Sequence, residues 1–81
     1  MIGQSHAAPT EAPRRRCPLT DAELVVIRQL ALGHDYPAIA LQIGIAESTV
    51  RGRVFSACRR ISASNRAHLV ALAMSRGWIR L

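Results

Sequence analysis

Residues 37–61, PAIALQIGIAESTVRGRVFSACRRI, decide the fold of this chain. A short apolar stretch ends at Gly44, and a longer stretch begins at about Glu47 and continues to about Ile61. Apolar residues recur every three or four positions in both stretches, as they do in α-helices with one buried face. The segment therefore predicts two helices joined by a tight turn, which is a helix-turn-helix.

The second of these helices carries two different faces. The residues expected to point into the core are Val50, Val54, Cys58 and Ile61. The opposite face holds polar, basic and aromatic residues, namely Ser48, Arg51, Gly52, Phe55 and Arg59. A helix that follows a short turn and exposes such a stripe is the kind that enters the major groove of DNA. We therefore predict that residues 47–61 form a recognition helix.

Cap signals extend the helical pattern to both sides. The start signals are Thr20 with Glu23, Asp35 and Asn65, and the stop signals are Gly33, Gly44 and Gly77. They predict a first helix from about residue 21 to 32 and a fourth from 66 to 76. The residues expected to reach the core from these helices are Val26, Ile27, Leu30, Ala31, Leu69, Val70 and Ala73, with Leu24 and Leu32 on a different stripe. No segment alternates long enough to predict a strand, so residues 19–81 are expected to form one all-α domain of four helices.

Residues 1–18 differ from the rest in composition. They are rich in proline, alanine and small polar residues and have no helical or strand period. They are expected to form a disordered arm. The arm contains three consecutive arginines at positions 14–16. It is either a solubilising tail or an arm that follows a phosphate backbone or enters a minor groove.

Charge indicates the class of partner. The chain of 81 residues has 11 basic residues against 5 acidic ones, and every basic residue is arginine. All the acidic residues lie at or before Glu47, so residues 48–81 carry only positive charge. A field of one sign attracts polyanions. The composition therefore favours double-stranded DNA as the partner over an ordinary solvated surface.

Other functional classes find little support in the sequence. Cys17 and Cys58 lack a nearby second pair of ligands for zinc, and the histidines are dispersed, so we expect no metal, cofactor or catalytic site. No apolar run is long enough to span a membrane, and the first residues lack the apolar stretch of a signal peptide. These features predict a cytoplasmic, nucleoid-associated protein that is not an enzyme.

The ordered set of signals resembles a known family. The matching positions are Leu19, Thr20, Glu23, Gly33, Ile39, Ala40, Gly44, Ile45, Thr49, Val50, Arg60, Ile61, Asn65, Arg66, Ala73 and Gly77. In this order and register they resemble the LuxR/NarL-type (GerE-like) DNA-binding domain over about residues 19–79. The resemblance implies a bacterial four-helix domain whose third helix reads DNA and whose fourth helix pairs two subunits.

Roles of individual residues follow from this resemblance. It implies base contacts from Arg51, Gly52 and Phe55, to which the exposed stripe adds Ser48. It implies phosphate contacts or helix positioning by Thr49, Arg53 and Arg60, to which the basic charge adds Arg59 and Arg66. The face expected to form a homodimer contains Ala67, Ala71, Met74 and Trp78. The sequence departs from the family pattern at Ala46, where the family has a capping serine, and Gly52 is an unfavourable residue inside a helix.

The complete prediction is a stand-alone, sequence-specific transcriptional regulator. Its length leaves no room for a receiver or ligand-binding domain, so we expect control through its abundance or through a partner. A protein-interaction module is the alternative, in which the apolar first helix contacts a sigma factor, RNA polymerase or another regulator. A nucleoid protein that binds DNA without sequence preference is a third reading of the same charges.

Overall fold

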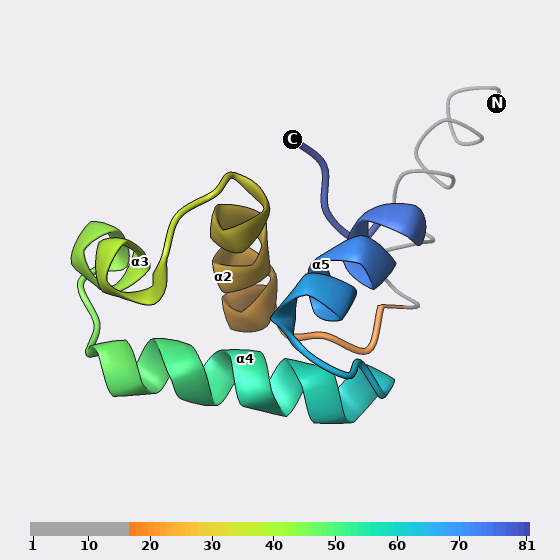
Figure 1. Ribbon diagram of the computed structural model, residues 1–81, viewed down its shortest axis with the longest axis horizontal. Helices are drawn as coiled ribbons and strands as arrows, with labels where there is room; N and C mark the ends of the chain where they lie inside the picture. Colours follow the sequence, from red (N-terminus) through yellow and green to blue (C-terminus); the bar gives the residue numbers. More distant parts are fainter. Residues whose placement is uncertain (1–16) are drawn as a thin grey trace, which may run out of the picture.

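The computed structural model describes residues 17–81. This part of the chain forms four helices and no strand, in the order α2 (Asp21–Ala31), α3 (Tyr36–Ile43), α4 (Glu47–Ile61) and α5 (Arg66–Ser75). The longest helix, α4, runs along one side of the domain, and α2, α3 and α5 all lie on its other side (Figure 1). The predicted all-α, four-helix fold is confirmed. Most of the predicted arm, including Arg14–Arg16, lies outside the described residues.

The capping box that was predicted for α2 is present. The backbone N–H of Glu23 donates to Oγ1 of Thr20 at 3.1 Å, and the backbone N–H of Thr20 donates to Oε1 of Glu23 at 2.9 Å. These bonds satisfy two of the donors that a helix start leaves without an intrahelical partner. At the other end, Gly33 takes a φ of +96°, a conformation that few other residues adopt. The residues at the two ends of α2 therefore determine where the helix begins and ends.

The turn between α3 and α4 brings the two helices together. Asp35 caps α3 by accepting a hydrogen bond from the backbone N–H of Ala38 at 3.0 Å. Gly44 ends α3 in the left-handed conformation, with φ of 72°, and its N–H donates to the carbonyl of Ala40 at 2.9 Å. Glycine carries no steric penalty in that conformation, so the chain reverses within a few residues and α4 begins at Glu47.

Ala46 leaves the start of α4 without a side-chain cap. Its backbone is extended, with φ of −70° and ψ of 149°, which is the conformation in which a serine would accept a hydrogen bond from the first turn. We expect Ala46→Ser to raise the free energy of unfolding by about 1 kcal/mol, measured by urea denaturation. The control is Ala71→Ser inside α5, where a hydroxyl gains no cap and slightly lowers helix propensity. Equal effects of the two substitutions would contradict the prediction.

The core lies between α4 and the other three helices. Its buried apolar residues are Leu19, Val26, Ile27, Ile39, Ala40, Val50, Val54, Ala57, Leu69, Ala73 and Ile79. The chain after α5 contributes to it, because Gly77 turns back with φ of 73° and Ile79 becomes buried. The backbone N–H of Trp78 donates to the carbonyl of Ala73 at 2.8 Å and closes this end of the helix.

One core position of α4 was not predicted, and two predicted orientations need correction. Ala57 is fully buried in α4, whereas Cys58 and Ile61 are only half-buried against the core. The core face of α4 therefore includes the small Ala57 beside the predicted apolar positions. Leu24 packs partly against the core, although it was assigned to another stripe. Trp78 does the same, although it was assigned to an exposed face.

Candidate nucleic-acid interface

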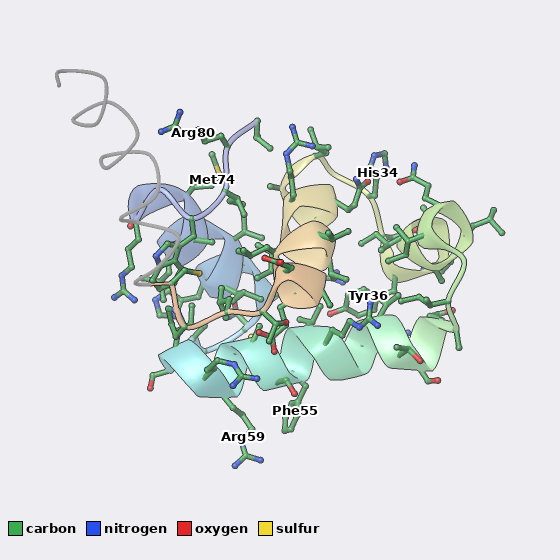
Figure 2. The ribbon with its side chains drawn as sticks, turned by 180° about the vertical axis from the view of Figure 1, so that it is seen from behind. His34, Tyr36, Phe55, Arg59, Met74 and Arg80 are labelled. Atoms are coloured by element: carbon green, nitrogen blue, oxygen red, sulfur yellow. The ribbon has the colours of Figure 1, made fainter. Side chains whose placement is uncertain are left out.

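No other helix of the described residues covers the outward face of α4 (Figure 1). The five residues predicted for it, Ser48, Arg51, Gly52, Phe55 and Arg59, are all exposed. Phe55 and Arg59 project away from the other helices (Figure 2), and 64% of Phe55 is accessible to solvent. The guanidinium carbon of Arg59 lies 5.8 Å from the centre of the Phe55 ring. A cation and an apolar ring therefore project together at the middle of this face.

Arg51 lies at the edge of this face and has two partners within the domain. Its Nη2 atom donates to Oε2 of Glu47 at 2.8 Å, one helical turn earlier. Its guanidinium carbon also lies 4.8 Å from the centre of the Tyr36 ring. The side chain is still 62% exposed, so the ion pair is weak and open to competition from an anionic ligand.

A groove of about 520 Å³ follows the flank of α4. Its walls include residues from three helices, among them Tyr36, Arg51, Phe55, Cys58, Arg59 and Arg66. Arg66, the first residue of α5, places its guanidinium carbon 5.0 Å from the centre of the same Tyr36 ring. Burial raises the pKa of the Cys58 thiol, so this wall of the groove is neutral at physiological pH. The groove is therefore basic along its arginines and open to solvent.

The residues predicted to contact phosphates occupy different surroundings. Thr49, Arg59 and Arg66 are exposed, and Arg53 is half-buried. Arg60 has a partner within the fold, because its Nη2 atom donates to Oε2 of Glu23 at 3.0 Å. The Glu23 side chain is only 5% exposed, whereas that of Arg60 is 43% exposed. Arg60 therefore joins the end of α4 to the start of α2, and its side chain stays partly exposed.

The predicted pairing face of α5 is only partly formed as expected. Ala67, Ala71 and Met74 are exposed, and Met74 lies near the end of α5 that is distant from α4 (Figure 2). Trp78 is half-buried, and the guanidinium carbon of Arg76 lies 5.3 Å from the centre of its ring. The exposed part of this face is therefore small and built mainly from alanine.

Sequence reasoning did not find the role of Tyr36 in the groove. Nothing in the local spacing links it to Arg51 or Arg66. The three residues belong to three different helices, so only the packing of α3, α4 and α5 brings them together. An aromatic ring at the start of the first helix of a helix-turn-helix was the one available signal.

No helix within residues 17–81 combines the length and apolar character required to cross a lipid bilayer. In the same part of the chain, no three His, Cys, Asp or Glu side chains are grouped so that they could hold a metal ion.

Comparison with known proteins adds two relatives. No protein-family model matches the sequence, so the resemblance to the LuxR/NarL type stays a prediction. The chain is 34% identical over 64 residues to the transcriptional regulatory protein YdfI of Bacillus subtilis (strain 168), an alignment that covers 79% of this chain and 30% of that protein. It is 32% identical over 62 residues to the uncharacterized transcriptional regulatory protein YvfU of the same organism, covering 76% of this chain and 31% of that protein. The chain thus spans about a third of the length of these relatives, and its helical domain is similar to one part of two bacterial transcriptional regulatory proteins.

Proposed function

We propose that this chain is a sequence-specific DNA-binding domain of a transcriptional regulator, and that α4 lies in the major groove. The observation that carries the proposal is the uncovered face of α4, which exposes Arg51, Phe55 and Arg59 while Val50, Val54 and Ala57 anchor the opposite face in the core. The major groove of B-DNA is wide enough to admit an α-helix. The names of the two relatives support a regulatory role.

The two kinds of contact that such a complex needs are both available. Ser48, Arg51, Gly52 and Phe55 lie on the outward face and are the residues for base edges, with the Phe55 ring suited to a thymine methyl group. Arg59, which lies beside the Phe55 ring, and Thr49, Arg53, Arg60 and Arg66 are the residues for phosphates. Phosphate contacts supply much of the affinity and set the register, and base contacts supply the preference.

Pairing of two copies through α5 is part of the proposal. The exposed Ala67, Ala71 and Met74 would allow a close approach of two helices, with Trp78 at the edge. A dimer of this kind places its recognition helices in half-sites about one turn, ~10 bp, apart. The stoichiometry of the complex on DNA, measured by analytical ultracentrifugation, tests this part. A monomer both free and on its site would contradict it.

Selection of binding sites from random double-stranded DNA tests the central proposal. We expect a preferred sequence, and an affinity for it that falls with salt but exceeds the affinity for unrelated DNA by about a thousandfold or more. Phe55→Ala should reduce that preference with little change in stability, because the ring is exposed. Salt-dependent binding without any preference would indicate a nonspecific nucleoid protein. Absence of DNA binding would leave the protein-interaction module, with the exposed Val25 of α2 and Leu32, the C-cap of that helix, as its surface.

Gly52 gives a prediction in which stability and binding change in opposite directions. It lies inside α4 and is exposed, and a Cβ atom there would meet nothing within 4 Å. We therefore expect Gly52→Ala to raise the free energy of unfolding by about 1 kcal/mol, measured by urea denaturation. We expect the same variant to bind the selected DNA about tenfold less tightly, since the added methyl group keeps the helix backbone away from the bases.

The control for this prediction is Ser56→Ala, at an exposed position one turn later in α4. This substitution also improves helix propensity, but it does not change how closely the helix backbone at Gly52 can approach the bases. Gains in both stability and DNA affinity for Gly52→Ala would show that the glycine is only a tolerated weakness of the helix.

A further inference from the structure

Two arginines from different helices meet at one aromatic ring. The guanidinium carbons of Arg51, in α4, and Arg66, in α5, lie 4.8 Å and 5.0 Å from the centre of the Tyr36 ring. A tyrosine ring attracts cations to its electron-rich face and holds a planar guanidinium in a preferred orientation. Tyr36 therefore gathers two positive charges that would otherwise repel one another.

The nearby acidic groups neutralise this pair only partly. Glu47 accepts a hydrogen bond from Nη2 of Arg51, which leaves further donors on that guanidinium. Asp35, which precedes Tyr36, directs Oδ1 to the backbone N–H of Ala38. The guanidinium group of Arg66 lies against the Tyr36 ring, and the residue is exposed. The cluster thus keeps a net positive charge on a surface that is open to solvent.

The start of α5 adds backbone donors on the same side. Asn65 caps this helix by accepting a hydrogen bond from the backbone N–H of His68 at 2.9 Å. The backbone N–H groups of Arg66 and Ala67 precede that bond in the first turn, where a helix carries partial positive charge. Two forked cations beside a helix start match the oxygens of a phosphate group.

The position of the cluster indicates which phosphate it would take. The groove that contains Tyr36, Arg51 and Arg66 also contains Phe55 and Arg59 of the outward face of α4. A DNA strand that borders the major groove around α4 would pass along this flank. We infer that Tyr36, Arg51 and Arg66 form a clamp for one backbone phosphodiester of the bound DNA.

This inference rests on the proposed function and makes it more specific. It assigns Arg51 to a phosphate in place of the base contact that the sequence predicted. It also adds Tyr36 as a positioning residue, whose ring lies against both guanidinium groups. Base preference then depends on Ser48, Gly52 and Phe55.

The test compares four proteins on a duplex of fixed sequence: the wild type, Arg51→Ala, Arg66→Ala and the double variant. Each single substitution is expected to weaken DNA binding about tenfold. The factor by which the double variant weakens binding should be smaller than the product of the two single factors. If both arginines hold one phosphate, the slope of log affinity against log salt falls by about 0.9 in total in the double variant, because only one phosphate contact is lost. Arg76→Ala is the matched control, because Arg76 also stacks on an aromatic ring but at the other end of α5.

Methylphosphonate linkages, which remove the charge of one phosphate at a time, locate the contact. One linkage should weaken binding by the wild type about tenfold and leave the double variant unaffected. Tyr36→Phe keeps the ring and should bind as the wild type does, whereas Tyr36→Leu should bind about threefold less tightly with an unchanged base preference. Circular dichroism of each variant confirms that it is folded.

Three results would overturn the clamp. Arg51→Ala could change the preferred base at one position without altering the salt slope, which would make Arg51 a base reader. Losses that multiply, with a slope change of about 1.8 in the double variant, would place the arginines on separate phosphates. A wild type that binds no duplex at low salt would remove the clamp together with the proposed function, whereas the first two results leave DNA binding intact.

Discussion

Replacing Glu23 with alanine is expected to lower the free energy of unfolding by about 3 kcal/mol. The Glu23 side chain is almost fully buried, and its two oxygens have separate partners: Oε1 accepts from the backbone N–H of Thr20, and Oε2 accepts from Arg60. Alanine removes half of the capping box and the ion pair between α2 and α4 at once. Loss of one partner from a buried pair costs about 3–5 kcal/mol, and the lower end applies because Arg60 can recover water.

Urea denaturation of a series of variants measures this effect. Glu47→Ala is the matched control, because Glu47 also pairs with an arginine, but its side chain is 41% exposed, and its loss should cost less than about 1 kcal/mol. Glu23→Gln retains an oxygen for the N–H of Thr20 and should cost less than Glu23→Ala. The prediction fails if Glu23→Ala and Glu47→Ala unfold at the same urea concentration.

The Glu23 pair also separates what the sequence could predict from what it could not. The bond between Thr20 and Glu23 spans three residues, and the spacing alone predicted it. The bond between Glu23 and Arg60 spans 37 residues and depends on how α4 crosses α2. Sequence reasoning assigned Glu23 to a cap and Arg60 to DNA, with nothing to connect them. The structure gives Arg60 a role in the fold as well.

Helix bounds were predictable for the same local reason. α4 begins and ends at Glu47 and Ile61 as predicted, and α2, α3 and α5 follow the caps at Thr20, Asp35 and Asn65. The exposed face of α4 was also correct, because charged and apolar residues separate clearly around that helix. The predicted burial was wrong where the size of a side chain is a poor guide to its position. Ala57 is small and buried, whereas Trp78 is large and only half-buried.

Part of the candidate site could likewise be predicted from the sequence, and part depends on how the helices pack. Its exposed residues on α4 could be identified from one helix, since they share one face. The groove beside them could not, because Tyr36, Arg51 and Arg66 approach one another only after three helices have packed. Pattern reasoning therefore found which helix faces outward and missed how its arginines are held.

The packing of α5 sets the position of Arg66, and Leu69 anchors that helix. Leu69 is fully buried, and Ala73, one turn later, is the other buried residue of α5. The larger of the two carries most of the apolar contact between α5 and the core. Leu69→Ala should therefore lower the free energy of unfolding by about 3 kcal/mol through lost burial and the cavity it leaves. A domain of this size has only about 5 kcal/mol in total, so the variant should be partly unfolded at 37 °C.

The matched control is Met74→Ala, which shortens another large apolar side chain of α5, but one that is 44% exposed. It should cost less than about 1 kcal/mol in the monomer, and if α5 pairs two subunits it should weaken their association instead.

Hydrogen exchange then shows which helix of the Leu69→Ala variant unfolds first. Amides of α5 that exchange before those of α2 and α4 would mean that α5 undocks first and takes Arg66 away from Tyr36, with loss of DNA affinity before loss of the fold. Equal stability of the Leu69→Ala and Met74→Ala variants would contradict the anchoring role of Leu69.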